Sequence, residues 1–273
     1  MKPLLKLIFP ALFAVLIVTG SCIKDESQAF TDTPIVEAYL TPGNYLKLKV
    51  SRQVPFLSEV TYSADDIDNL LIAVNYNDSK HLLTAIDSGW YTDSSILVKE
   101  SDIFNLSFIF NSKEVSAYTY IPSKPANMTQ SAVKIYVPRM DSTSGPPTGT
   151  ISDPVEITWS NEHESYYLVV VENIESTLDP IYDFEDDDRP GNRFRKSPTN
   201  SAFESIRPMD FRYYGTHRVI LYHVLPDYAA LYDQNSSSSI NLTNPTTSIN
   251  NGYGIFTGMS SDTLYIEVIE SSK

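Results

Sequence analysis

Runs of alternating apolar and polar residues recur along this 273-residue chain, and they restrict its fold more than any other feature. The pattern is clearest in residues 45–50 and 104–110, where leucine, valine or phenylalanine occupies every second position. A period of two places one set of side chains on each face of a β-strand. Residues typical of turns separate the runs, and the first half of the chain shows no amphipathic helix pattern. The sequence therefore predicts an all-β protein built from antiparallel strands.

The chain is predicted to contain two β-sandwich domains, divided by the Pro-Ser-Lys-Pro run at 122–125, because proline does not pair within a central strand. Residues 34–122 are predicted to form an Ig-like or transthyretin-like sandwich. Residues 126–273 are predicted to form a fibronectin-type-III-like sandwich, because a strand carrying Trp159 precedes a strand at 166–172. These two strands are expected to pair. The individual strands are predicted at 35–40, 45–50, 70–76, 81–86, 104–110, 115–121, 133–137, 155–159, 166–172, 211–224 and 263–269, with a polar bend at 65–69.

Three departures from regular strands are expected in the second domain. Residues from about 175 to 210 have no sustained period and are predicted to be a loop insertion. Pro226–Tyr232 is predicted to be a short helix, since proline suits its first turn and Asp227 suits its N-terminal dipole. Residues 251–258 are predicted to form a tight, glycine-dependent turn before the closing strand, with Ile255 or Phe256 buried under this helix.

The first 22 residues have the pattern of a bacterial lipoprotein signal. Lysines precede an apolar run at 7–18, three small residues follow, and Cys22 comes next. The run is shorter than the ~20 apolar residues of a membrane-spanning helix, and proline interrupts it. Residues 1–21 are therefore predicted to be cleaved, Cys22 to carry lipid, and residues 22–33 to form a tether. Lys24, Asp25 and Glu26 resemble the export signal of surface lipoproteins in Bacteroidota.

The net charge of the chain limits its partners. The formal charge is −14, and removal of the signal with its two lysines brings it to −16. Nucleic-acid binding is excluded, because it requires clustered lysine and arginine. Lipid rather than electrostatic attraction is expected to hold the protein on its membrane. Cys22 is the only cysteine, so neither a disulfide nor a thiolate metal site is expected.

Polar clusters in the sequence suggest no definite cofactor or metal. Asp183, Glu185 and Asp187 lie in an acidic run and are candidate Ca²⁺ ligands, but their spacing lacks the glycine and bidentate glutamate of an EF-hand loop. A solvated, partly self-neutralised loop is the favoured interpretation. His217 and His223 lie ~20 Å apart along an extended strand, too far to hold one metal ion. His81 and His163 are isolated, and no catalytic motif occurs.

The aromatic residues allow two interpretations. They form either a recognition surface, as exposed aromatic rings do at interfaces, or half-buried packing within strands, and packing is favoured. The residues concerned are Trp90, Tyr91, Tyr213, Tyr214, Tyr228 and Tyr253.

Five short segments occur in an order that resembles a family of lipoproteins from Bacteroidota known only as a domain of unknown function. They are Val36–Leu40, Ser51–Pro55, Pro226–Tyr228, Asn244–Pro245 and Gly252–Phe256. Members of that family often lie beside TonB-dependent outer-membrane receptors, so the resemblance implies an accessory role at the cell surface. It implies no catalytic residues.

The sequence thus favours a noncatalytic, surface-exposed outer-membrane lipoprotein that binds a TonB-dependent receptor or the nutrient it imports. No cofactor is expected, and the binding residues are left open. The alternative is an exported hydrolase of peptides or glycans, in which aspartate and glutamate perform acid–base catalysis. Two carboxylates ~5–10 Å apart across a cleft would favour the hydrolase. A third possibility is a purely structural or adhesive surface module.

Overall fold

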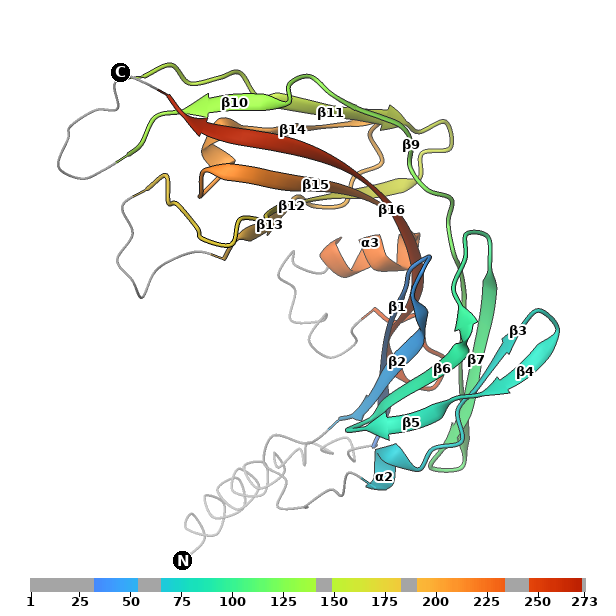
Figure 1. The fold of residues 1–273 in the computed structure, drawn as a ribbon. Helices are drawn as coiled ribbons and strands as arrows, with labels where there is room; N and C mark the ends of the chain where they lie inside the picture. Colours follow the sequence, from blue (N-terminus) through green and yellow to red (C-terminus); the bar gives the residue numbers. More distant parts are fainter. Residues whose placement is uncertain (1–31, 54–64, 141–148, 183–190, 234–245, 272–273) are drawn as a thin grey trace, which may run out of the picture. The chain divides into compact units, whose positions relative to one another are not determined.

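The computed structural model describes residues 32–53, 65–140, 149–182, 191–233 and 246–271. Strands follow one another through most of these ranges (Figure 1), so the prediction of an all-β sandwich fold is confirmed. The strands of the first half are β1 (Pro34–Leu40), β2 (Tyr45–Arg52), β3 (Ala73–Tyr76), β4 (Ser79–Leu82), β5 (Thr84–Asp87), β6 (Trp90–Leu97), β7 (Ile103–Phe110) and β8 (Lys113–Tyr120). Those of the second half are β9 (Ala126–Gln130), β10 (Lys134–Val137), β11 (Val155–Ser160), β12 (Tyr166–Asn173), β13 (Arg193–Arg195), β14 (Phe203–Ile206), β15 (Gly215–Val224) and β16 (Tyr253–Glu270).

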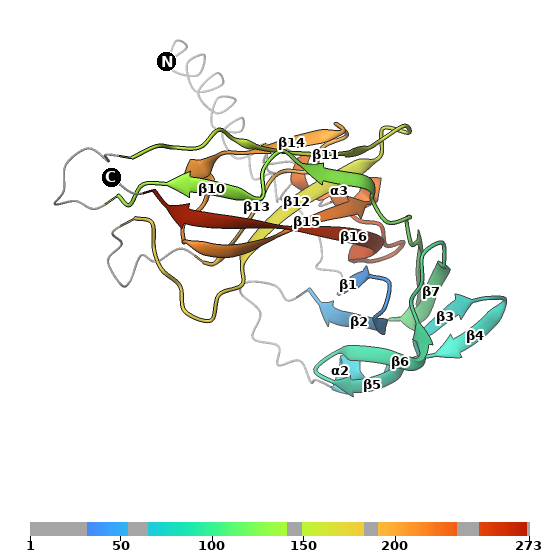
Figure 2. The ribbon, with the colours of Figure 1, turned by 45° about the horizontal axis from the view of Figure 1, so that its top comes forward.

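The first sandwich buries the apolar side chains that the alternating pattern predicts. One of its layers contains β1, β2, β6 and β5, and the other has the strand order β4-β3-β7-β8 (Figure 2). Leu46 and Leu48 of β2 and Phe104 and Leu106 of β7 are all buried in one core between the layers. Residues 45–50 and 104–110 therefore form strands, as predicted, and the predicted set of side chains in each strand faces the core.

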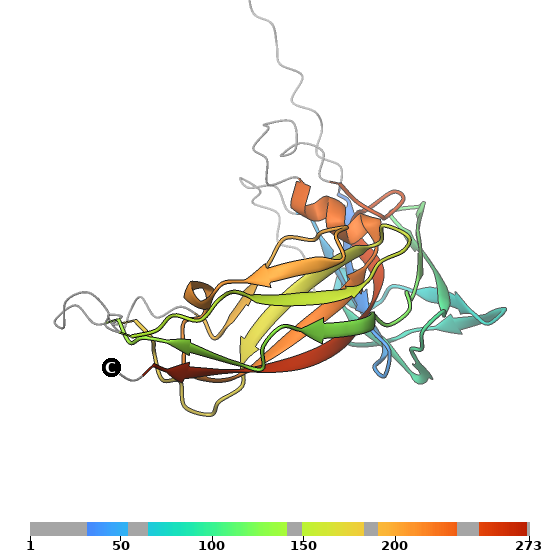
Figure 3. The same cartoon turned by 90° about the horizontal axis from the view of Figure 1, so that it is seen from above.

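The second sandwich packs a three-stranded sheet, β14-β11-β9, on the sheet β13-β12-β15-β16, which β10 extends by pairing with β16 in parallel (Figure 3). Trp159 is buried in the core between them, as predicted. The expected pairing of the 155–159 and 166–172 strands is wrong. β11 pairs with β9 and β14, whereas β12 pairs with β13 and β15, so the short connection at 161–165 crosses from one sheet to the other.

The last strand, β16, contributes to both cores. Phe256 lies in the core of the first sandwich, whereas Ile266 and Val268 lie in the core of the second. Glycine is required where other backbones approach this strand. A Cβ on Gly258 would lie 2.1 Å from the carbonyl oxygen of Tyr120, a distance that no side chain tolerates. One sheet of nine strands therefore runs through both sandwiches.

The prediction of a tight turn at residues 251–258 is wrong beyond its start, because residues 253–258 lie in strand β16 and pair with β1. Asn251 has a positive φ of 56°, and the strand begins two residues later. Phe256 is buried, but in the first sandwich rather than under the helix α3 (Pro226–Asp233). Thr257, on the opposite face of β16, contacts the helix, and its hydroxyl donates to Oδ1 of Asp227 at 3.0 Å.

Several segments are more regular than their sequence suggested. The described part of the expected insertion at 175–210 contains β13, β14 and a 3-10 turn, η2 (Pro208–Asp210), all too short for a periodic signal. The polar bend at 65–69 contains one helical turn, α2 (Asp65–Asp68). The predicted strand at 81–86 is two strands, β4 and β5, in different sheets, with Leu83 buried between them. β6 and β9 have no counterpart among the predicted strands.

Candidate functional site

The outward face of the nine-stranded sheet carries the candidate site. Paired residues on neighbouring strands point to the same face. The register pairs Leu168 of β12 with Tyr222 of β15, and Tyr39 of β1 with Thr257 of β16. It continues on β2, where Lys49 pairs with Trp90 of β6. These side chains therefore lie on the face opposite the two sandwich cores.

A first hollow of about 610 Å³ lies on this face beside α3. Its floor is a small apolar cluster that includes Leu168, Val170 and Met259. Volumes of 300–1,000 Å³ are typical of small-molecule sites. The described residues that line it are Tyr39, Thr41, Leu168, Val170, Arg193, Phe194, Arg195, Tyr222, Tyr228 and Met259.

Tyrosines form the wall of the first hollow on the side of α3. The ring of Tyr228 lies edge-on to that of Tyr39, with centroids 6.0 Å apart, and contacts Tyr232 at 5.7 Å. Burial raises the pKa of both Tyr39 and Tyr228 above the ordinary value of 10.0. The phenol groups therefore stay protonated at neutral pH, and the hydroxyl of Tyr228 lies 3.3 Å from that of Tyr232.

Two arginines on the edge strand β13 supply positive charge to the first hollow. Phe194, between them, points into the second core and packs edge-on against Phe211 at 5.8 Å, so Arg193 and Arg195 point outward. The guanidinium of Arg195 lies 5.1 Å from the ring centroid of Tyr232. Within the described ranges, neither arginine has a carboxylate within 4.0 Å.

A second hollow of about 500 Å³ continues along the same face over β1, β2 and β6. Tyr39 and Thr41 line both hollows. Its aromatic rings are exposed, 50% for Tyr39, 58% for Tyr45 and 37% for Trp90. The ammonium of Lys47 lies 4.2 Å from the ring centroid of Trp90. The other lining residues are Glu37, Ala38, Asn44 and Thr92. We call the two hollows together the groove.

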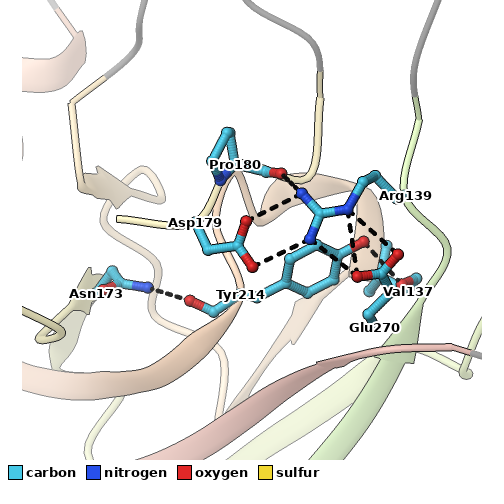
Figure 4. Close-up of polar contacts among 7 residues, drawn as sticks. All are labelled: Val137, Arg139, Asn173, Asp179, Pro180, Tyr214 and Glu270. Atoms are coloured by element: carbon cyan, nitrogen blue, oxygen red, sulfur yellow. Dashed lines mark hydrogen bonds and ion pairs between the residues drawn. The ribbon is translucent and has the colours of Figure 1, made fainter. Parts of the chain in front are cut away.

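Arg139 is a structural arginine that binds several acceptors within the protein (Figure 4). Its two Nη groups donate to both carboxylate oxygens of Asp179 at 2.9 and 3.0 Å, and it also binds Glu270 and the carbonyl of Pro180. Nε donates to Glu270, so all five N–H groups have acceptors. The guanidinium lies 4.8 Å from the centroid of Tyr214, whose pKa burial raises to about 12. Asp179 and Glu270 thus share one cation.

A third hollow, of about 360 Å³, is lined by two carboxylates, Asp78 in the β3–β4 turn and Asp102 just before β7. Asp102 accepts hydrogen bonds from the backbone N–H of Lys99 at 2.8 Å and from the hydroxyl of Tyr76 at 3.3 Å. Asp78 lies in a turn where its φ is +58°. Both residues therefore have roles in closing turns.

The histidines predicted to be structural or surface residues occupy such places. His217 is buried, and its Nε2 lies 3.4 Å from the amide of Asn173 while its Nδ1 lies 3.1 Å from the carbonyl oxygen of Gly215. An Nδ1–H tautomer satisfies both contacts. His223 stacks on Tyr167 at 4.8 Å, and His163 is exposed. No cluster of potential metal ligands occurs in the described ranges.

Several predicted site residues lie outside the described ranges. These are the lipidation residue Cys22, the export residues Lys24, Asp25 and Glu26, and the acidic candidates Asp183, Glu185 and Asp187. Of the six aromatic residues, Tyr91, Tyr213 and Tyr214 are buried, as the packing interpretation predicts. Trp90 and Tyr228 line the groove instead.

Tyr39, Arg193 and Arg195 were not identified from the sequence as binding residues. For Tyr39 a signal exists, since it occupies the outward phase of a strand whose other phase is apolar. The sequence instead assigns the arginines to the partly self-neutralised charged loop, and β13, with only three residues, is too short to indicate a face.

Comparison of the chain with protein-family models and with curated proteins finds no match. The resemblance to the lipoprotein family therefore stays a prediction from the sequence. Within the described ranges, no helix combines the length and apolar character needed to span a membrane.

Proposed function

We propose that this protein is a noncatalytic binding protein that holds an anionic, ring-containing small molecule in the first hollow. It acts at the bacterial surface as an outer-membrane lipoprotein, accessory to a TonB-dependent receptor. The observation that carries the proposal is the setting of Arg193 and Arg195. In a chain with a formal charge of −14, two arginines without a described carboxylate partner line one hollow.

The chemistry of the first hollow selects the ligand class. A guanidinium binds carboxylate, sulfate or phosphate with a planar fork of N–H donors. The apolar floor and the rings of Tyr39 and Tyr228 suit a flat, weakly polar face, and the phenol groups suit hydroxyls on its edge. A ligand with an anionic group on a sugar or aromatic ring meets all three requirements.

Calorimetric titration with para-nitrophenyl glucuronide tests the proposal, with para-nitrophenyl glucoside as the neutral match. The glucuronide should bind at least ~10-fold more tightly, a difference of ~1.4 kcal/mol. The double variant Arg193→Gln/Arg195→Gln should remove that difference, whereas Arg207→Gln, an arginine paired with Asp210 outside the groove, should preserve it. Equal binding of the two compounds by the wild-type protein would refute an anion-selective site.

The proposed location rests on residues 1–26. A charged start, an apolar run and small residues before a single cysteine support cleavage and lipidation at Cys22. Cys22→Ala should release the protein from membranes or leave it uncut. Replacement of Lys24, Asp25 and Glu26 by alanine should keep the lipid but reduce cleavage by external protease in intact cells. Unchanged fractionation with normal processing in the first case contradicts lipidation, and unchanged accessibility in the second contradicts the export role.

The association with a TonB-dependent receptor rests on the family resemblance alone. Purification of the lipidated protein from its own outer membrane, followed by identification of bound proteins, tests it. The same purification of the Cys22→Ala variant is the control, because proteins that bind this variant as well bind without the lipid anchor. If no receptor copurifies with the lipidated protein, the association with a receptor is contradicted, whereas ligand binding in the groove is not.

The hydrolase alternative has one point in its favour, the two carboxylates of the third hollow. The hydrogen bonds that Asp102 accepts from Lys99 and Tyr76, and the position of Asp78 in a turn, support structural roles for both. Hydrolysis of para-nitrophenyl glycosides or of peptide amides by the wild type, lost in Asp102→Asn, would favour the enzyme and overturn the noncatalytic proposal.

A further inference from the structure

The two hollows of the groove are parts of one surface. Both lie on the outward face of the same sheet, and Tyr39 and Thr41 line both. The strand order from the first hollow to the second is β12-β15-β16-β1-β2-β6. At ~4.8 Å per strand, the five steps span ~24 Å across the sheet, and because β15 and β1 pair with different parts of β16, a displacement along the strands adds to this distance. This length exceeds that of a single sugar or aromatic ring.

Each hollow combines exposed aromatic rings with a cation. The first has the exposed Tyr39 and the half-buried Tyr228 beside Arg195, and the second has the exposed Tyr45 and Trp90 beside Lys47. Within the described ranges, Lys47 has no carboxylate within 4.0 Å, so its charge is compensated only by the face of Trp90. The same chemistry therefore occurs twice along one path, as a ligand built of repeated units requires.

We infer that the ligand is an acidic oligosaccharide that occupies both hollows at once. This inference rests on the proposed function and adds the second hollow to it. The apolar C–H faces of pyranose rings pack on Tyr39, Tyr45 and Trp90, and the carboxylates of successive units bind the arginines and Lys47. Engagement of a second hollow by the same molecule raises affinity without any change in the first.

A peptide fits this surface less well. An extended peptide gains affinity mainly by adding a strand to an exposed sheet edge, where its backbone forms a ladder of hydrogen bonds. The groove lies on the face of the sheet, where the backbone groups already pair between strands such as β1 and β16. Rings with polar edges use such a face without a backbone ladder.

Titration with digalacturonate and tetragalacturonate tests the inference, and maltotetraose serves as the neutral control of equal length. The wild type should bind the tetramer at least ~10-fold more tightly than the dimer, because only the tetramer reaches both hollows. Trp90→Ala and Tyr45→Ala should each bring the tetramer close to the affinity of the dimer, with the dimer unchanged. Tyr118→Ala, which removes an exposed ring of β8 outside the groove, should change neither.

The outcomes separate this inference from the proposed function. If the dimer and the tetramer bound equally tightly and both depended on Arg193 and Arg195, the ligand would not occupy the second hollow. The first hollow would remain the binding site. Equal losses for both lengths in the two aromatic variants would also refute it. Binding of neither acidic oligomer would overturn the choice of acidic oligosaccharide, whether or not para-nitrophenyl glucuronide binds. Tight binding of maltotetraose would refute the role of charge.

Discussion

Arg139, at the end of the second core, and Arg195, on the outward face of the nine-stranded sheet, have opposite settings, although the outward face also carries the ion pair of Arg218 with Glu172. At the end of the second core, Arg139 has an acceptor for every N–H group, and it joins the segment after β10 to residues 179–180 and to the end of β16 (Figure 4). On the outward face, Arg195 contacts the ring of Tyr232 and no described carboxylate. The same residue type thus stabilises the fold in one place and stays available to a ligand in the other.

This difference separates stability from binding along the same strands. β16 carries Phe256 and Ile266 on its core-facing phase and Thr257 and Met259 on its outward phase, where these two residues are also buried. Substitutions on the buried side should change the free energy of unfolding and spare the affinity of folded molecules. Substitutions in the groove should do the reverse. Each substitution or condition below tests one side of this division.

Phe256→Ala should have the largest effect on stability. The ring has no exposed surface and lies in the first core, so its removal leaves a cavity worth ~3–5 kcal/mol, against ~5–15 kcal/mol for a whole domain. Urea unfolding followed by tryptophan fluorescence measures the loss. Thr257→Val, the neighbour on the opposite face, is the matched control and should cost less. A loss below ~1 kcal/mol for Phe256→Ala would contradict the assignment of this ring to the core.

Mild acid should have the next largest effect, through His217. Burial lowers the pKa of His217 from 6.5 to about 4, so between these values the unfolded chain binds a proton that the folded protein does not. The free energy of unfolding therefore falls as the pH falls from about 6.5 to about 4. At ~1.36 kcal/mol per pKa unit, the loss from this residue is ~3 kcal/mol.

Comparison with His217→Gln isolates that contribution. His223, whose pKa burial also lowers, acts in the same direction, and Asp227, whose pKa burial raises, acts in the opposite direction. Both remain in the variant, so the difference between the two pH profiles belongs to His217. Parallel profiles for the wild type and the variant between pH values of about 4 and 6.5 would show that His217 is not buried in its neutral form.

Arg139→Gln should lower the free energy of unfolding by ~1–2 kcal/mol, less than Phe256→Ala or the acid effect on His217. Hydrogen bonds between charged groups contribute ~1.5–3 kcal/mol when shielded, but the side chain of Arg139 is 36% exposed, and solvent screens its ion pairs. The variant leaves Asp179 and Glu270 without their common cation. Urea titration at neutral pH measures the cost. If the variant were as stable as the wild type, the hydrogen bonds of Arg139 would add no net stability.

The buried face was the part that the sequence could predict. Strict alternation at residues 45–50 and 104–110 assigns each side chain to a face, and Trp159 reads as core for the same reason. Strand pairing was harder to predict. β1 pairs in parallel with β16, more than 200 positions later, and no local pattern indicates such a partner. The split between β4 and β5 depends on one buried residue, Leu83.

The groove could not be predicted because it depends on those long-range pairings. Tyr39, Lys47 and Arg195 come from three separate segments, and only the shared register places them on one face. The packing interpretation of the aromatic residues is correct where both phases of a segment are covered, as at Tyr213 and Tyr214. It fails for Trp90, whose ring lines the groove. The sequence does not indicate which strands are neighbours, so it cannot show which outward rings lie together.

Arg195→Gln should have the smallest effect on stability and is the direct counterpart of Arg139→Gln. The contact that it removes is the one with Tyr232, and an exposed cation–π pair contributes ~0.5–1 kcal/mol at most. Surface substitutions of this kind usually stay within ~0.5 kcal/mol, so the unfolding curves of the variant and the wild type should nearly coincide. Affinity for para-nitrophenyl glucuronide should nonetheless fall, whereas Arg139→Gln should leave it unchanged. If Arg195→Gln destabilised the protein as much as Arg139→Gln does, Arg195 would be a structural residue, and the division between the two faces of the sheet would not hold.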